Sequence, residues 1–461
     1  MRPTRLLIPH DILVDIFLEY VFQGGSPLTI SAVCRQWRYS ALSIPRLWLR
    51  ISLLPETRCL QLASSEERLR TLAQRAGAHH TLEVVINPSP SIYRIGPAFG
   101  GHHALKLVHL LVRLLPPTRW RGLTLRHLSN ACWTVVREGL RVPFSRLESI
   151  SVSSRKFERI EEAQCRMLNG ILLCSPIVHT VHLGTAWYQE SVNIPSTVTT
   201  LVTRMLDTNQ HKLLPLVRSL HLTCRIGASL EACPQVFQLS VDSANLCDFR
   251  TRSTPPLKVL TIQHLQTRRM YSSSALGKLQ EVHLPHLVSL RVKSGDPASL
   301  KLLHAPKLKE LELLTSEVSR HSYEDQLSCL LGSTTPNKRP SLRPMFLTIR
   351  VVGAEHVIPQ LIASQPQLVS LTVHISSGRF DKLLLVLETL EEAIRLEDDT
   401  KAPQHCPNLK RLGIRLEWRR RDDCEIQTEL SRLIALRTSL DEVTCDWADG
   451  ATRRFTRSVR T

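Results

Sequence analysis

Residues 306–313 read PKLKELEL, and this pattern decides the fold. Apolar residues stand two, five and seven positions after the proline, so the last part alternates as a short strand with one buried face does. The template Pro-x-[Leu/Val]-x-x-[Leu/Val]-x-[Leu/Ile/Val] occurs eight times, starting at Pro176, Pro215, Pro234, Pro255, Pro285, Pro306, Pro366 and Pro407. Two looser copies start at 195 and 143, with one and two residues inserted.

The copies recur about every twenty residues from 176 to 255, and most later gaps are close to multiples of twenty. The interval before 285 is an exception and contains an extra strand-like segment at 279–284. A period near twenty with this leucine pattern is typical of a leucine-rich-repeat solenoid, in which neighbouring strands stack into a parallel sheet. We therefore predict an α/β fold with a curved, irregular solenoid over residues 81–447.

The first fifty residues have a helical pattern instead. Ile12, Leu13, Ile16, Phe17 and Tyr20 fall on one helical face. The pattern predicts a helical module over 1–50, a helical linker over 51–80 with a helix at about 57–76, and a first strand at 81–86. Loops are predicted at 87–104 and 332–345, because these stretches are rich in Pro, Gly and Ser. The basic tail at 448–461 ends in RRFTRSVRT (453–461), and this end is expected to be frayed.

The composition limits the classes of partner. Lys and Arg number 59 against 41 Asp and Glu, a formal charge of +18. This balance indicates acidic partners such as nucleic acid or phosphorylated segments, although an arginine-rich chain can also reflect codon bias. The apolar fraction of 43% is that of a folded protein, and no sequence stretch is long and apolar enough to cross a membrane.

No motif for catalysis or metal binding is present in the sequence. The glycine-rich, nucleophile and zinc-protease patterns are all absent. The 12 cysteines form no C-x-x-C pair, so we expect reduced thiols in a cytoplasmic or nuclear protein. The sequence thus predicts a protein that is not an enzyme, with no catalytic residue, cofactor, metal ion or membrane anchor.

The segment IPHDILVDIFLEYVFQGGSPLTISAVCRQWRYSALSIPRLW at 8–48 resembles an F-box. The ordered match consists of Pro9, Ile12, Leu13, Ile16, Phe17, Leu28, Val33, Cys34, Arg35, Trp37, Leu47 and Trp48, with Ile8 in place of the usual Leu. The continuation at 71–86 is similar to F-box-like proteins of basidiomycete fungi. This resemblance covers the first ninety residues, and the remainder is similar only as an irregular leucine-rich array.

The resemblance implies a three-helix F-box that binds a Skp-type adaptor and, through it, a cullin-RING ubiquitin ligase. Apolar residues exceed what forty residues can bury, and such an excess marks a partner surface. The implied adaptor-binding residues are Pro9, Ile12, Leu13, Ile16, Phe17, Leu28, Val33, Cys34, Trp37, Leu47 and Trp48. The two tryptophans are also expected to wedge the helices together. Alternatively, these side chains simply fill a small core.

The predicted function is substrate recognition in a Skp–cullin–F-box ligase that directs ubiquitin-dependent degradation, with the repeats holding the target protein. Positions four and six after each proline point away from the core. The candidate target-binding residues are His182, His221, Ser240, Arg291, Glu312 and Thr372. Two alternatives stay open: an F-box scaffold outside any ligase, and a basic scaffold that binds nucleic acid or phosphorylated partners.

Overall fold

In the computed structural model of the chain, the copies of the repeat template whose turns are described form a turn followed by one strand. The N–H of Leu308 donates to the carbonyl of Ala305 at 3.1 Å, which places Pro306 second in the turn. The fixed backbone angle of proline suits this position. Matching bonds precede other described template strands, for example from Val217 to Leu214 at 3.3 Å. The template proline is therefore a turn residue, and the strand begins four residues after it.

The structure describes most of the chain in segments. These are residues 8–23, 25–53, 62–87, 97–126, 143–153, 162–184, 192–203, 214–223, 232–244, 246–249, 256–266, 281–295, 302–315, 342–351, 364–375, 408–416, 423–436, 440–448 and 450–456, with isolated positions between them. They form two compact units, Met1–Asp207 and Thr208–Thr461.

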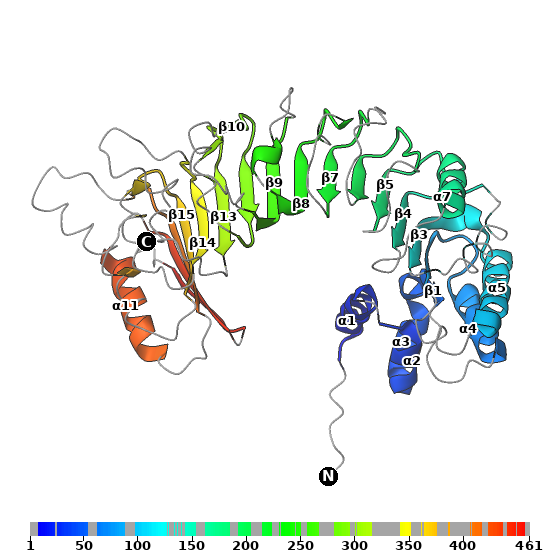
Figure 1. The fold of residues 1–461 in the computed structure, drawn as a ribbon. Helices are drawn as coiled ribbons and strands as arrows, with labels where there is room; N and C mark the ends of the chain where they lie inside the picture. Colours follow the sequence, from blue (N-terminus) through cyan, green and yellow to red (C-terminus); the bar gives the residue numbers. More distant parts are fainter. Residues whose placement is uncertain are drawn as a thin grey trace, which may run out of the picture. The chain divides into compact units, whose positions relative to one another are not determined.

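The first unit contains the N-terminal helices and the first strands of the repeat array. Its α-helices are α1 (His10–Phe22), α2 (Pro27–Val33), α3 (Arg35–Ser43), α4 (Leu62–Arg75), α5 (Pro97–Leu114) and α7 (Glu162–Leu173), with short 3-10 helices η1 (Pro45–Trp48) and η3 (Pro117–Arg119). Its strands are β1 (Arg50–Leu53), β2 (Leu82–Ile86), β3 (Trp120–Arg126), β4 (Ser149–Ser153), β5 (Thr180–Leu183) and β6 (Thr200–Thr203). These strands pair in chain order, all parallel. Figure 1 shows α4, α5 and α7 along one side of this sheet.

The second unit extends the same strand-per-repeat pattern. Its main sheet contains β7 (Ser219–Leu222), β8 (Gln238–Ala244), β9 (Val259–Leu265), β11 (Ser289–Val292), β13 (Glu310–Thr315), β14 (Phe346–Val351), β15 (Ser370–Ile375), β16 (Arg411–Leu416), β17 (Glu442–Trp447) and β18 (Thr452–Thr456). All neighbours are parallel except β17 and β18. Strands β10 (Val282–His283) and β12 (Leu303–His304) form a separate parallel pair. The helices bounded within the described residues of this unit are η7 (Leu246–Phe249) and α11 (Asp423–Leu436).

Burial alternates along the template strands as the sequence predicts. In β15 the buried residues are Leu371, Val373 and Ile375, and those between them are partly exposed. Since each strand buries only one face by itself, stacking successive strands is what makes the leucine core continuous. The large, mostly parallel sheet confirms the α/β class and is compatible with a solenoid.

Three boundary predictions are wrong. Strand β1 lies inside the predicted helical linker and pairs with β2, so the sheet begins at Arg50. Helix α5 begins at Pro97, inside the predicted loop, and proline suits the first position of a helix. The tail is not frayed at its start, because β18 forms an antiparallel edge with β17. Residues 57–61 of the predicted linker helix, 88–96 of the first loop and 457–461 of the tail lie outside the described residues.

The long gaps between template copies hold fewer strands of the main sheet than their lengths predict. Strands β15 and β16 are direct neighbours, although their prolines stand about two periods apart. Between β13 and β15, only β14 belongs to the sheet. The extra segment at 279–284 does contain a strand, β10, but this pairs with β12 outside the main sheet. Insertions between strands therefore leave the stacking unchanged.

Candidate binding surfaces

Helix α1 has two apolar stripes that lie side by side. Leu13, Phe17 and Val21 recur every four residues and are buried. Ile12 and Ile16 lie one position earlier on the helix and are 51% and 46% exposed. Residues four apart share a helix face, so the first stripe is core and the second is an apolar surface without cover from the described residues.

Exposed apolar residues concentrate on these N-terminal helices. Of the fourteen large hydrophobic side chains found exposed among the described residues, eight lie between Ile8 and Leu42. Between Ile8 and Leu42, the other six exposed residues are Ile12, Ile16, Tyr20, Phe22, Val33 and Tyr39. Soluble chains seldom gather so many on so short a segment unless something covers them. We call Ile8, Ile12, Ile16 and Tyr20, which recur every four residues, the apolar stripe.

The buried stripe is held by aromatic and hydrogen-bond contacts. The Phe17 and Trp37 rings meet edge to face with centroids 5.1 Å apart. The indole N–H of Trp48 donates to the carbonyl of Ala41 at 2.9 Å, which ties η1 to α3. The guanidinium of Arg75 lies 4.4 Å above the Trp48 ring, so α4 also packs there. Both tryptophans thus join helices, as predicted from the sequence.

Cys34 has a local structural role that the sequence reasoning missed. It separates α2 from α3 in an extended conformation, and its thiol sulfur accepts a hydrogen bond from the N–H of Trp37 at 3.4 Å. A side chain that accepts from the third residue of a helix is an N-cap. The position of Cys34 between two helical patterns is the sequence signal that could have predicted this N-cap. The thiol is exposed, so capping leaves it open to contact.

The eleven predicted adaptor-binding residues divide by burial. Pro9, Ile12, Ile16, Val33 and Cys34 are exposed, and Leu28 and Trp37 are half-buried. The other four, Leu13, Phe17, Leu47 and Trp48, are buried in the unit and reach no surface in this conformation. In this conformation, only the exposed residues of this set can contact a partner directly.

The predicted target-binding positions form a register row on the outward face of the sheet. In the second unit, His221 lies opposite Ser240 and Arg291 lies opposite Glu312. Thr372 belongs to the same row as Glu312, because both lie opposite Thr348 on the strand β14 between them. Strands β9 and β14 supply Thr261 and Thr348 to the same row. In the first unit, His182 lies between Ser151 and Val202. All six predicted residues are at least partly exposed.

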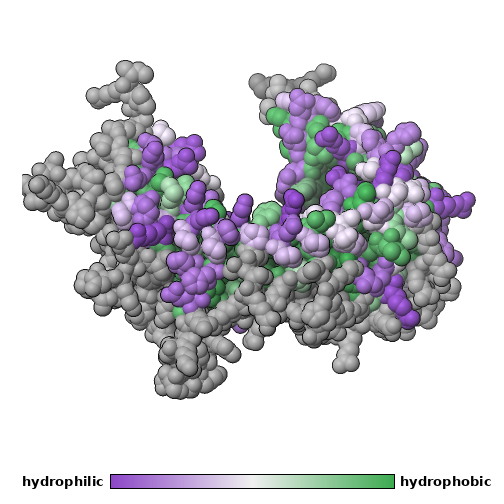
Figure 2. All heavy atoms as spheres, turned by 90° about the horizontal axis from the view of Figure 1, so that it is seen from above, coloured by the Kyte–Doolittle hydropathy of each residue, from purple (hydrophilic) through white to green (hydrophobic). Residues whose placement is uncertain are grey.

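Cross-strand ion pairs cover this outward face. The guanidinium of Arg291 pairs with Glu312 on the next strand, and His221 lies 3.2 Å from the Asp242 carboxylate. In the first unit, a hydrogen bond from Arg121 at 2.9 Å is the main cause that lowers the pKa of Glu148. Exposed pairs of this kind contribute at most about 1 kcal/mol each, so they shape the surface charge more than the stability. Figure 2 shows hydrophilic side chains over much of the described surface, with apolar ones between them.

The template also missed a group of charged residues on β14–β16. Arg350, His374 and Arg415 are in register on three adjacent strands. The pKa of His374 is lowered to about 4, first by burial and then by the charges of Arg415 and Arg350, while Asp446 acts in the opposite direction. Strand β14 escaped detection because Leu342 stands where the template has proline.

No group of three or more metal-binding side chains was found among the described residues. Within the same residues, no helix has the length and apolar character needed to cross a membrane. No protein-family model matches the chain, and no curated protein matches it at a meaningful level.

Proposed function

We propose that this chain is the substrate-recognition subunit of a Skp–cullin–F-box ubiquitin ligase. Helices α1–α3 and η1 act as the F-box that binds a Skp-type adaptor, and the strand repeats act as a leucine-rich-repeat solenoid that binds the target protein. The observation that carries the proposal is the apolar stripe, which is exposed on the module whose sequence resembles an F-box.

The stripe has the properties of a protein-binding surface. Its members lie on α1 or, in the case of Ile8, two residues before the helix begins, and none of them is charged. The core of a protein interface is depleted in charge and rich in apolar and aromatic groups, with polar groups at the rim. Asp11, Asp15 and Glu19 are exposed on the same helix and supply such a rim.

The proposed mechanism is tethering and involves no bond chemistry in this chain. An adaptor held on the stripe and a target held on the sheet keep the target near a ubiquitin-charged enzyme. The transfer then becomes effectively intramolecular, with effective concentrations on the order of millimolar. This role requires a location in the cytoplasm or nucleus, where the adaptor and cullin are found.

Co-purification with a Skp-type adaptor tests the proposal. Wild type is compared with Ile12→Ser/Ile16→Ser, whose side chains are exposed and therefore leave the core intact. Ile177→Ser is a matched control, because Ile177 and Ile16 are both 46% exposed. Losing two partly buried isoleucines from an interface costs about 2–3 kcal/mol, or roughly 30- to 160-fold in affinity. The control is expected to bind like wild type.

Each outcome separates one alternative. Absence of adaptor from the wild-type eluate refutes the proposal. Cullin in the same eluate supports a ligase, and adaptor without cullin indicates a scaffold outside any ligase. Binding to oligonucleotides that falls steeply with salt, without adaptor, supports the nucleic-acid scaffold instead.

A further inference from the structure

A line of residues at the amino-terminal ends of six neighbouring strands alternates between basic and apolar side chains. Each residue of the line directly precedes its strand, and the strands β7, β8, β9, β11, β13 and β14 are neighbours in the sheet. All six residues belong to the second unit. We call these residues, Arg218, Phe237, Lys258, Val288, Lys309 and Met345, the turn edge.

Backbone hydrogen bonds hold the turn edge in register. The N–H of Phe237 donates to the carbonyl of Arg218 at 3.0 Å, and the N–H of Lys258 donates to the carbonyl of Phe237 at 2.7 Å. The same bond recurs at 2.8 Å at each of the next steps, up to Met345. Because neighbouring strands are about 4.8 Å apart, side chains of one kind recur roughly every 9.6 Å along the edge.

The basic side chains of the turn edge are exposed and have no acidic partner among the described residues. Arg218, Lys258 and Lys309 form no ion pair within this part of the chain. Glu310 follows Lys309 on β13, yet no ion pair joins the two. The described turn residues, 215–218, 234–237, 256–258, 285–288, 306–309 and 342–345, include no Asp or Glu. The positive charge of the edge is therefore available to a partner.

Apolar side chains are exposed on the same edge. Among the described residues of the second unit, the exposed large hydrophobic side chains are Leu216, Phe237, Met345 and Phe346, at 37–43%. Phe237 and Met345 belong to the turn edge, Leu216 lies in its first turn, and Phe346 begins β14 directly after it. Exposed apolar groups that alternate with unpaired cations along one line indicate a partner that is both apolar and acidic.

We propose that the turn edge binds an acidic amphipathic α-helix of the target protein. This deepens the proposed function, on which it rests, by naming the class of segment that the repeats hold. The helix lies along the edge and across the strands. Its acidic side chains meet the three cations, and its apolar side chains meet the three apolar residues between them.

The spacing of the edge favours a helix over other segments. Seven residues of an α-helix advance about 10.5 Å, close to the roughly 9.6 Å between like side chains on the edge. A helix that alternates acidic and apolar residues every three or four positions therefore meets each group in turn. An extended segment repeats one face about every 6.6 Å and falls out of step. A nucleic acid fits less well, because its successive phosphates would also lie against the apolar residues.

The test uses the purified full-length chain and fluorescent helical peptides, with binding measured by anisotropy. The probe peptide alternates three leucines and three glutamates on one face. A matched peptide has the same composition with its glutamates on the opposite face, and another has serine in place of leucine. Wild type is expected to bind the probe at least tenfold more tightly than either.

A charge exchange at Lys258, the central cation of the edge, tests the contact itself. Lys258→Glu should weaken probe binding at least tenfold, and a probe with lysine in place of its central glutamate should bind this variant at least tenfold better than wild type. Lys293→Glu is the matched control, because Lys293 is also exposed and forms no ion pair with a described residue. It directly follows β11, whereas the turn edge directly precedes its strands. The control should bind the probe within twofold of wild type.

Equal binding of the probe and either matched peptide would overturn the inference. So would an equal loss in Lys293→Glu, which would indicate a general attraction to the net charge, or no gain for the central-lysine peptide in Lys258→Glu. Displacement of the probe by oligothymidylate as strong as that by unlabelled probe would favour a nucleic acid instead. Lys258→Glu leaves the N-terminal helices unchanged and should still co-purify with the adaptor, so a failure of this inference is distinct from a failure of the ligase proposal.

Discussion

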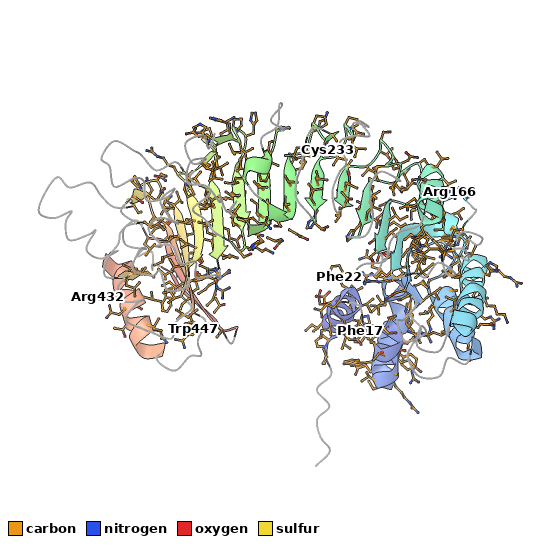
Figure 3. All side chains as sticks on the ribbon, in the orientation of Figure 1. Phe17, Phe22, Arg166, Cys233, Arg432 and Trp447 are labelled. Atoms are coloured by element: carbon orange, nitrogen blue, oxygen red, sulfur yellow. The ribbon has the colours of Figure 1, made fainter. Side chains whose placement is uncertain are left out.

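Replacing Phe17 by Ala tests whether the buried stripe of α1 is core. The side chain is 1% exposed and meets Trp37 edge to face, whereas Phe22 on the same helix is 81% exposed (Figure 3). Truncating a buried phenylalanine to alanine lowers the free energy of unfolding by about 3–5 kcal/mol, which includes the cavity and the lost ring contact. Phe22→Ala removes no buried contact and should cost less than about 0.5 kcal/mol.

A module of about forty residues has only a few kcal/mol of stability of its own. Phe17→Ala should therefore open α1–α3 locally while the strands of the second unit stay folded. Hydrogen exchange measured by mass spectrometry reports this directly: amide protection in α1–α3 should fall at least about 100-fold, since 3 kcal/mol corresponds to more than two factors of ten. Protection in β7–β9 should not change.

Equal protection in Phe17→Ala and wild type would refute the assignment of this stripe to the core, as would equal losses in the two phenylalanine variants. The result also decides how adaptor binding is tested. A variant that changes Phe17 loses the adaptor by unfolding the module, so only substitutions on the exposed stripe, such as Ile16→Ser, report on the contact itself.

Three further predictions concern other parts of the chain. Gly295→Ala should destabilise the second unit by about 2 kcal/mol in thermal or urea unfolding, because the glycine has φ 106° and a side chain there meets the β9 backbone. Gly170→Ala in α7 is the control and should be neutral or stabilising, because a Cβ at that position meets nothing within 4 Å. Because the pKa of His374 is about 4 in the folded chain, below its ordinary value, the unfolded chain binds more protons below about pH 6.5 and stability falls toward pH 4. As the pH falls from 7 to 4, the unfolding free energy of His374→Gln should therefore rise by about 1–2 kcal/mol relative to that of wild type, a figure reduced because the histidine is partly exposed. A difference between the two proteins that stays constant with pH would contradict the lowered pKa of His374. Burial raises the pKa of Cys233 to about 12, so a thiol reagent followed by peptide mass mapping should label the exposed Cys34 and not Cys233 in the folded chain.

The repeat sheet could be predicted where local chemistry determines it. A proline at the second position of a turn and alternating apolar residues after it define a strand without any knowledge of the rest of the chain, and β5, β11 and β16 all follow this rule. Strand β14 keeps the alternation but replaces the proline by Leu342, so the template misses it. Pairing, by contrast, is non-local: β15 accepts β16 as its neighbour across a long insertion, and no spacing rule reveals that.

Helical periodicity has the same limit on α1. It places Ile12, Ile16, Leu13 and Phe17 on one broad apolar face, but it cannot say which edge of that face meets α3. The partner helix makes the choice, since the Trp37 ring packs on Phe17 and leaves Ile16 outside.

The outward face of the sheet carries a similar lesson about charge. A net charge of +18 indicates an acidic partner but gives no position for it, because paired cations contribute to the sum as much as unpaired ones. Contacts on the sheet place some of these charges in pairs: Arg291 lies opposite Glu312 and Arg415 opposite Asp446, each carboxylate on the next strand.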